Sequence, residues 1–242
     1  MEGMSRRKML AALGSVPLVA GAGVLAVRDR SLFGGGAHRF QPVAASGPES
    51  ARSMLQQKHL PNLRLVTQDG KSVRFYDDLV KDKKVVLTFM NTDSQTLASS
   101  KKMSENLATL QKFFGSRLGK DMHFYTITSN PTRDTPAVLK DWSTQYSNGK
   151  GWTFLTGSTK NVEQLRDSLG FASEFGQDQT DPNFSVGILR YGTEPEMRWA
   201  HCQSQSAPRV LAHSMLLDFG VDPADPTPPP VWNCSRLVGN LA

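Results

Sequence analysis

Apolar residues recur with two different periods along the middle of the chain, and this predicts a succession of strands and helices. The continuous apolar run at 85–90 is typical of a strand that is buried on both faces. Within 95–118, apolar residues recur every three or four positions, which predicts a helix. Further strands are predicted at 63–66, 73–75, 123–128, 152–155, 184–191 and 196–200, and further helices at 135–146, from 159 to near 170 and at 207–218.

The order of these elements predicts an α/β protein. An Asp-Gly turn at 69–70 joins the first two strands into a hairpin. The strands and helices that alternate after it favour a central sheet with helices on both faces. We therefore predict a thioredoxin-like fold, with a central mixed sheet, helices on both faces and an N-terminal β-hairpin extension. Six large apolar residues are predicted to lie in the core: Met90, Phe113, Phe114, Trp142, Phe154 and Phe171.

The first 30 residues have the pattern of an export signal. The basic start Ser5-Arg6-Arg7-Lys8-Met9-Leu10 precedes a Gly- and Ala-rich apolar stretch, and its paired arginines resemble a twin-arginine signal. The stretch at 9–27 is 19 residues long, close to the ~20 that span a bilayer, so a retained membrane anchor is the alternative. We expect export to the periplasm or the extracytoplasmic face of the membrane, with or without cleavage.

Composition divides the chain into four parts. The signal or anchor covers 1–30, and the Gly-, Ala- and Ser-rich segment 31–58 predicts a linker. The thioredoxin-like domain is predicted over 59–220. Repeated prolines in 221–242 disfavour helices and strand ladders, so this segment is predicted to be an extended C-terminal tail.

Composition and charge exclude several classes of protein. The chain is 38% hydrophobic and 21% charged, as in an ordinary globular protein. Its net charge of +6 comes partly from the N-terminus, and residues 31–242 show no basic stripe with interleaved aromatic residues, so no nucleic acid is expected as a partner. Two cysteines in 242 residues exclude a disulfide-dense scaffold and a zinc site built from two Cys pairs.

Two segments carry a specific resemblance to a known family. Residues 130–140 contain Pro-x-Arg-Asp-Thr-Pro-x-x-Leu, and residues 152–157 contain Phe-Leu-Thr-Gly. With the less specific segments 62–71 and 85–89, they resemble the Sco/SenC family over about residues 60–200. Members of this family are thioredoxin-fold, membrane-associated copper proteins that help to mature the dinuclear copper site of cytochrome c oxidase. The resemblance therefore implies that fold and a role in copper-protein assembly.

The resemblance also implies a copper site that this chain lacks. The family binds copper through Cys-x-x-x-Cys on the loop after the buried strand and through a distal His. The strand register places Ser94, Ala98 and Asn183 at these three positions. A serine hydroxyl is a hard, weak ligand for Cu(I), and alanine is none. We therefore expect no metal ligand, no catalytic residue and no cofactor at this site.

The neighbouring carboxylates offer no clear replacement chemistry. Asp93 and Asp134 lie near the same loop. Either Asp134 or Thr135 can cap the helix at 135–146, with Pro136 in its first turn, and a cap is the better interpretation of Asp134. No base is predicted beside Ser94. An enzyme is therefore not expected.

The only two cysteines, Cys202 and Cys234, have three interpretations, of which a redox-active pair is disfavoured because the short Cys-x-x-Cys spacing is missing. In an exported chain, a pair of cysteines more often forms a disulfide, which would tie the tail to the domain. Alternatively, the copper site has moved, and His201, His213 and Met215 join the two cysteines as soft ligands.

Three functions follow from these observations. The first is a non-redox binding or assembly factor, with a protein partner from a respiratory or copper-enzyme assembly system and contact with the membrane through an uncleaved N-terminus. The second is a copper metallochaperone with relocated ligands. The third, a thiol-dependent oxidoreductase or peroxidase, is disfavoured because the thioredoxin loop contains no cysteine.

Overall fold

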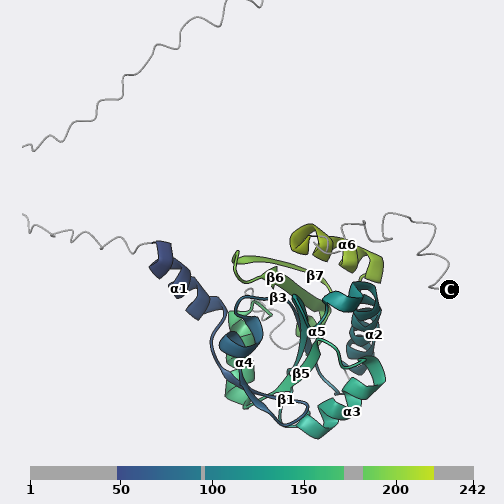
Figure 1. Cartoon of the computed structure of the whole chain (residues 1–242). Helices are drawn as coiled ribbons and strands as arrows, with labels where there is room; N and C mark the ends of the chain where they lie inside the picture. The colour runs from purple at the N-terminus through teal and green to yellow at the C-terminus, as the bar shows by residue number, and fades with distance from the viewer. Residues whose placement is uncertain (1–47, 94–95, 172–181, 221–242) are drawn as a thin grey trace, which may run out of the picture. The chain divides into compact units, whose positions relative to one another are not determined.

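The computed structural model describes residues 48–93, 96–171 and 182–220 (Figure 1). They form a seven-stranded sheet in the order β2-β1-β5-β4-β3-β6-β7. Strands β3, β4 and β5 are parallel, and the other pairings are antiparallel. The sheet is therefore mixed, as predicted. The strands are β1 (Arg64–Thr67), β2 (Ser72–Arg74), β3 (Lys84–Met90), β4 (Met122–Thr128), β5 (Trp152–Thr156), β6 (Ile188–Thr193) and β7 (Arg198–Gln203).

Helices cover both faces of this sheet (Figure 1). One face packs against α2, α3 and α6, and the other packs against α4 and the π-helix η1. The helices are α1 (Pro48–His59), η1 (Phe75–Val80), α2 (Leu97–Phe114), the 3-10 turn η2 (Gly115–Arg117), α3 (Pro136–Tyr146), α4 (Thr159–Ser168), α5 (Pro182–Gly187) and α6 (Pro208–Phe219).

Strand β3 shows why a continuous apolar run suits the centre of this fold. Val86 and Met90 point to the face covered by α2 and α6, whereas Val85, Leu87 and Phe89 point to the face covered by α4. All five are buried, because side chains alternate across a sheet that is covered on both sides. The six predicted core residues also pack in these two clusters; five are buried and Phe113 is half-buried.

Two elements differ from the prediction. Residues 48–58, assigned to a linker by composition, form most of α1; Glu49 in its first turn and Lys58 in its last turn match the helix dipole. Residues 184–187, predicted to be strand, belong to α5, and β6 begins only at Ile188. Pro182, the first residue of α5, has no backbone N–H. A strand ladder needs this donor, whereas the first turn of a helix does not use it.

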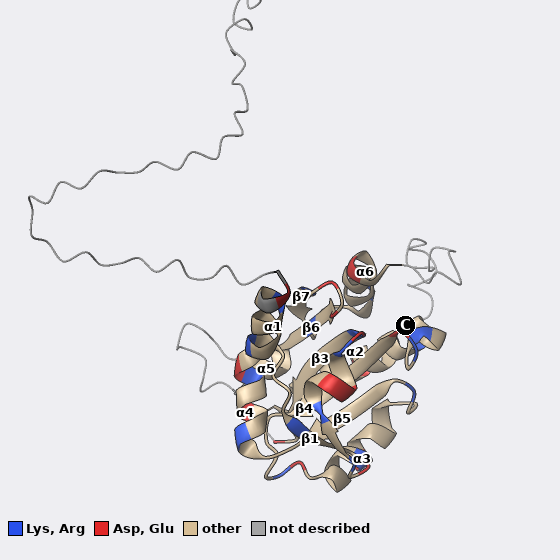
Figure 2. Cartoon of the chain, turned by 60° about the vertical axis from the view of Figure 1, so that its left-hand side comes forward, with Lys and Arg blue, Asp and Glu red and all other residues tan. Residues whose placement is uncertain are grey.

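The described part of the chain contains no helix that is both long and apolar enough to cross a membrane. The predicted signal or anchor at 1–30 and the predicted tail at 221–242 lie outside the described residues. Along the ribbon in Figure 2, Lys and Arg positions alternate with Asp and Glu positions rather than gathering in one element.

Candidate functional site

The loop after β3 lies where the resemblance places the family's copper ligands. Strands β3 and β4 are parallel, so this loop and the loop after β4 meet at the carboxyl edge of the sheet. Asp93 of the first loop forms an ion pair with Arg133 of the second, at 3.4 Å between Oδ2 and the guanidinium nitrogen. Both side chains are partly exposed, so the pair contributes at most about 1 kcal/mol.

Asp134, in the loop after β4, links the two loops through hydrogen bonds to its side chain. Its carboxylate is fully buried and accepts hydrogen bonds from the Thr92 backbone N–H (3.3 Å), the Thr92 hydroxyl and the Thr128 hydroxyl (2.6 Å). The expectation that Asp134 caps α3 is therefore wrong. Thr135 is the N-cap residue: its backbone is extended and its Oγ1 accepts from the Val138 N–H at 3.5 Å.

Hydroxyl groups at the start of α2 hold the other side of the loop. Ser100 Oγ accepts from the Asn91 N–H (3.1 Å) and donates to the Asn91 carbonyl (2.8 Å). The Thr96 hydroxyl donates to the same carbonyl at 3.2 Å, and Asn91 Oδ1 accepts from the Asp93 N–H at 2.8 Å. The polar groups of Asn91 and Thr92 therefore bond to other groups of the protein, among the residues that the structure describes here.

These residues do not fit a copper ion. The donors at the loop are hydroxyl, amide and carboxylate oxygens, which are hard ligands, whereas Cu(I) prefers thiolate and imidazole. Ala98, which the sequence register predicts at one of the family's cysteine positions, is exposed in the first turn of α2 and offers no ligand atom. Ser94 and the side chain of Asn183 lie outside the described part of the structure. Among the residues described, no three His, Cys, Asp or Glu side chains gather into a possible metal site.

The alternative ligand set is dispersed. Neighbouring residues of a strand point to opposite faces, so Cys202 packs beside the core under α6 while exposed His201 points to the other side of β7. Met215 is fully buried in the core, and His213 is exposed on α6. Cys234 lies outside the described residues, so its pairing with Cys202 stays a prediction.

Cys202 itself is half-buried and forms no disulfide with a residue that the structure describes. Burial raises the pKa of this thiol to about 11, because the apolar surroundings disfavour the thiolate. At neutral pH it is therefore almost entirely protonated, which makes it a weak nucleophile and a weak metal ligand.

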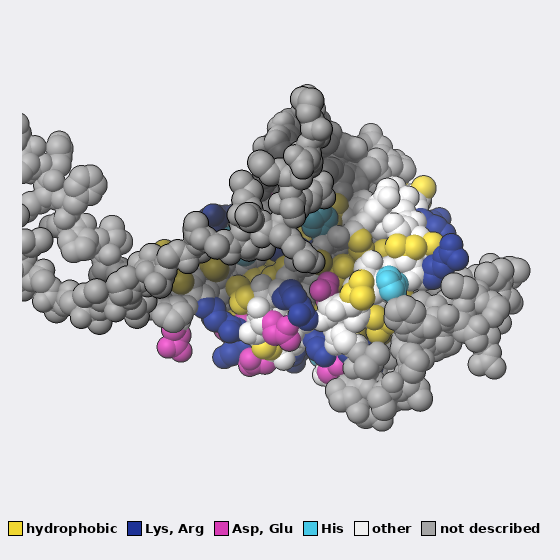
Figure 3. Space-filling model, turned by 90° about the horizontal axis from the view of Figure 1, so that it is seen from above, with side chains coloured by type: hydrophobic (Ala, Val, Ile, Leu, Met, Phe, Trp, Pro, Cys, Tyr) yellow, Lys and Arg dark blue, Asp and Glu magenta, His cyan; other side chains and the backbone are white. Residues whose placement is uncertain are grey.

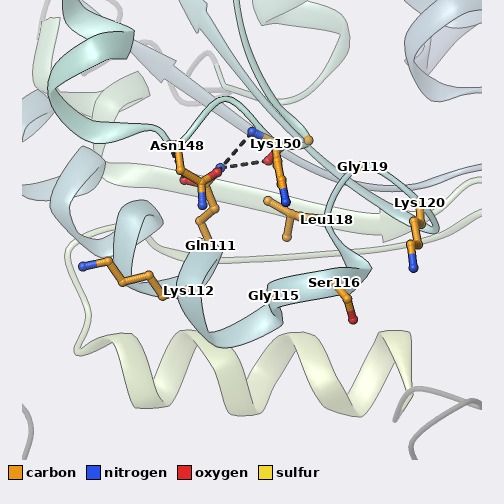
Figure 4. Close-up of a pocket in the computed structure, with 10 residues that line it drawn as sticks. Gln111, Lys112, Gly115, Ser116, Leu118, Gly119, Lys120, Asn148 and Lys150 are labelled. Carbon is orange, nitrogen blue, oxygen red and sulfur yellow. Dashed lines mark hydrogen bonds between the residues drawn. The ribbon is translucent and has the colours of Figure 1, made fainter.

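A cavity of about 840 Å³ lies at the opposite edge of the sheet, where β4 and β5 begin (Figure 4). The buried side chain of Gln111 fixes one wall of this cavity through two hydrogen bonds. Its Nε2 donates to the Lys150 carbonyl (2.8 Å), and its Oε1 accepts from the Asn148 N–H (3.1 Å). No residue proposed from the sequence lines this cavity, because its walls come from segments that meet only in the fold. It is lined by Gln111, Lys112, Gly115, Ser116, Leu118, Gly119, Lys120, Asn148, Lys150 and Gly151.

A comparison with protein families decides the classification of the chain. The family model SCO1/SenC matches residues 51–189, which is more than half of the sequence. The chain belongs to the SCO1/SenC family. No curated protein matches it.

Solved structures of Sco proteins share the fold. A SCO1/SenC family lipoprotein from Bacillus anthracis is 21% identical, with a TM-score of 0.50 over 63% of this chain and 90% of that chain. Yeast Sco1 with copper bound is 17% identical, with a TM-score of 0.50 over 67% of this chain and 94% of that one. The mixed sheet and these matches establish the thioredoxin-like fold that the sequence predicted.

Proposed function

We propose that this SCO1/SenC protein is an exported binding or assembly factor for a copper protein, and that it performs no redox or metal chemistry at the loop after β3. The observation that carries the proposal is the loop itself. Its oxygen donors are held by one another around Asp134, and an exposed alanine occupies one of the two cysteine positions.

Family membership supports the assembly role. One SCO1/SenC relative with a solved structure is described as a member of the Sco family of cytochrome c oxidase assembly proteins, and yeast Sco1 was solved with copper bound. The present chain keeps the sheet and two hydrophobic clusters that stabilise it, so the fold can present a surface to a partner. The proposed partner is therefore a protein of a respiratory or other copper-enzyme assembly system.

The two other functions receive less support from the structure. A metallochaperone with relocated ligands needs Cys202, His201 and Met215 to converge. Cys202 and Met215 belong to the same core cluster, but exposed His201 points to the other face of the sheet. A thiol oxidoreductase needs an accessible thiolate, and burial raises the pKa of the Cys202 thiol to about 11.

The absence of metal chemistry is tested by anaerobic Cu(I) titration of the reduced protein against a chromophoric chelator. We expect no tight one-to-one binding at micromolar protein. The matched variant Ser94→Cys/Ala98→Cys/Asn183→His, which restores the family's ligand types, is expected to bind Cu(I). Tight binding by the unmodified chain that is lost in Cys202→Ser would instead support the relocated site.

The assembly role is tested in host cells that lack the protein. We expect less copper and less activity in a membrane-bound copper oxidase, and full recovery with a Cys202→Ser/Cys234→Ser variant that circular dichroism shows to be folded. Unchanged copper content in the deletion strain would contradict an assembly role. Recovery with the wild type but not with the folded cysteine-free variant would contradict a non-redox role.

A further inference from the structure

Strand β7 forms an open edge of the sheet. It pairs with β6 on one side, and on its other side no strand of the described chain pairs with it. Edge strands of this kind commonly carry lysines or prolines that prevent pairing with other segments. Residues 199–203 contain neither; the stretch is Trp-Ala-His-Cys-Gln. The edge is therefore suited to accept an extended segment.

The register identifies which backbone groups face outward. Ser204 N–H donates to the Gly187 carbonyl at 2.8 Å, and hydrogen-bonded pairs recur every second residue along an antiparallel ladder. Cys202 opposite Leu189 is therefore also a hydrogen-bonded pair with β6. The N–H and C=O groups of Trp199 and His201 consequently point to the open side.

Cys202 occupies the position in which an added strand can be cross-linked. Because its backbone bonds to β6, it would form a non-hydrogen-bonded pair with a strand on the open side. Residues in such antiparallel pairs have Cα atoms about 4.5 Å apart, within the roughly 4.4–6.8 Å that a disulfide spans. The half-buried thiol packs on the face that α6 covers.

The C-terminal tail provides a matching segment within reach. Residues 231–238, Val-Trp-Asn-Cys-Ser-Arg-Leu-Val, contain no Gly or Pro and include several residues that favour strands. The tail follows α6, whose Asp218 lies 3.7 Å from the Arg198 guanidinium at the start of β7. Eleven linking residues at about 3.1 Å each extend further than the roughly 20 Å length of β7, so 231–238 can reach either end of the strand.

Apolar side chains are exposed on the same side of the molecule. Val210 and Leu217 of α6 are 49% and 71% exposed, and Figure 3 shows hydrophobic side chains at the surface on this side. In the register proposed below, an added strand would place Trp232 on the same face of the sheet as Cys202, the face that α6 covers.

We propose that residues 231–238 add to the open edge of β7 as an antiparallel strand, with Cys234 opposite Cys202 and their sulfur atoms joined in a disulfide. This register places Leu237 opposite Trp199. The two thiols lose two protons and two electrons to a disulfide-bearing oxidant, such as oxidised glutathione, which becomes two thiols. The strand addition does not depend on the proposed function, whereas the disulfide requires the oxidising compartment that export supplies.

The disulfide is tested on the full chain after incubation with oxidised glutathione. Alkylation in denaturant followed by mass spectrometry of the digested protein is expected to find both cysteines unlabelled and a peptide that joins Cys202 to Cys234. Cys202→Ser and Cys234→Ser should each leave one labelled thiol. Two labelled thiols in the treated wild type would overturn the disulfide.

The added strand is tested by hydrogen exchange of the Trp199 and His201 amides in the full chain. In the proposed register, the Ser235 N–H donates to β7 and the Arg236 N–H does not. Ser235→Pro should therefore accelerate hydrogen exchange of both amides at least about tenfold. The control Arg236→Pro should change these exchange rates less. Equal rates in the wild type, in Ser235→Pro and in a chain that ends at Gly220 would overturn the strand. Protection that increases with protein concentration would also overturn it, because a second copy would then occupy the edge.

Discussion

At the scale of single residues, Asp134 has a role that its position in the sequence does not indicate. It precedes a helix and has the side chain of a typical cap, yet Thr135 caps the helix instead. The carboxylate turns under the loop after β3, where it accepts hydrogen bonds from Thr92 and Thr128. Asp134 therefore stabilises the loop at which the resemblance predicts the family's copper ligands.

Replacing Asp134 should cost more stability than replacing the true cap. Asp134→Ala leaves the buried Thr128 hydroxyl and the Thr92 N–H without their acceptor, and we expect the free energy of unfolding to fall by about 2–3 kcal/mol. Thr135→Ala removes one exposed cap bond and should cost about 1 kcal/mol or less. Urea unfolding measures both values, and the reverse order would contradict these assignments.

His123 should make the stability depend on pH. Burial, and to a smaller extent the charge of Lys83, lowers the pKa of this imidazole below its usual 6.5. The unfolded chain therefore binds a proton more readily than the folded one, and stability is lost as the pH falls below about 6.5 towards the folded pKa. We expect His123→Gln to reduce the loss of stability between pH 7 and pH 5. An identical pH dependence in the variant and the wild type, measured by urea unfolding, would exclude this role.

At the scale of elements, Arg52 of α1 contacts the turn between β6 and β7, where it donates to the Pro195 carbonyl at 3.0 Å and pairs with the buried carboxylate of Glu194. Glu194, in the turn between β6 and β7, accepts hydrogen bonds from the Tyr76 hydroxyl (2.9 Å) and the Asp82 N–H (2.9 Å), and pairs with Arg52 of α1 at 3.3 Å. Burial and this carboxylate raise the pKa of Tyr76 to about 12, so its hydroxyl stays protonated and able to donate. The contact thus joins the first helix to a turn more than 130 residues later.

Loss of the Arg52 contact should loosen α1 alone. The Arg52 side chain is 47% exposed, so its pair with Glu194 is worth at most about 1 kcal/mol. Arg52→Ala is expected to accelerate hydrogen exchange of the α1 amides up to about fivefold, with little change in β3 and β4. Lys58→Ala in the same helix serves as the control because Lys58 forms no ion pair within the described chain. Equal acceleration in the two variants would show that the ion pair does not hold the helix.

The segments before β4 and β5 approach each other so closely that only glycine fits between them. A Cβ on Gly151 would lie 2.2 Å from the Gly119 backbone nitrogen, and the φ of Gly151 is +64°. Gly149 has a similar φ of +80°, but a Cβ there meets nothing within 4 Å. A side chain at either position would strain the backbone, but only a side chain at Gly151 would also clash with the neighbouring segment.

Gly151→Ala should accordingly be much more harmful than Gly149→Ala. We expect the control to lose about 1 kcal/mol from its left-handed backbone and Gly151→Ala to lose at least 2 kcal/mol more, because the two segments must move apart. Thermal unfolding measures the difference. Equal melting temperatures would show that the backbones can separate at little cost.

At the scale of the whole molecule, the two faces of the sheet carry separate hydrophobic clusters that share its strands. Val86 and Leu87 are neighbours in β3, yet they belong to different clusters. Loss of either cluster would expose one side of every central strand. We therefore expect a single cooperative unfolding transition, with coincident near- and far-ultraviolet circular dichroism curves. Separate transitions would show that one cluster survives without the other.

The sequence by itself determined the order of the main elements and much of the chemistry available. Periodicity predicted β3, α2 and α3, because it records which positions of one segment face a core. The same signal did not predict α1, whose residues are mostly exposed. The absence of any cysteine before residue 202 excluded the family's thiol pair without a structure.

Only the tertiary structure decided which of these groups meet. The carboxylate of Asp134 lies under the loop after β3 rather than capping α3, and Met215 is buried while His213 is exposed. No strand among the described residues pairs with the outer edge of β7. The tertiary structure also created the lysine-lined cavity from segments before β4 and β5. Local periodicity depends on residues a few positions apart, whereas hydrogen-bond partners, burial and an open edge depend on segments that folding brings together from distant parts of the chain.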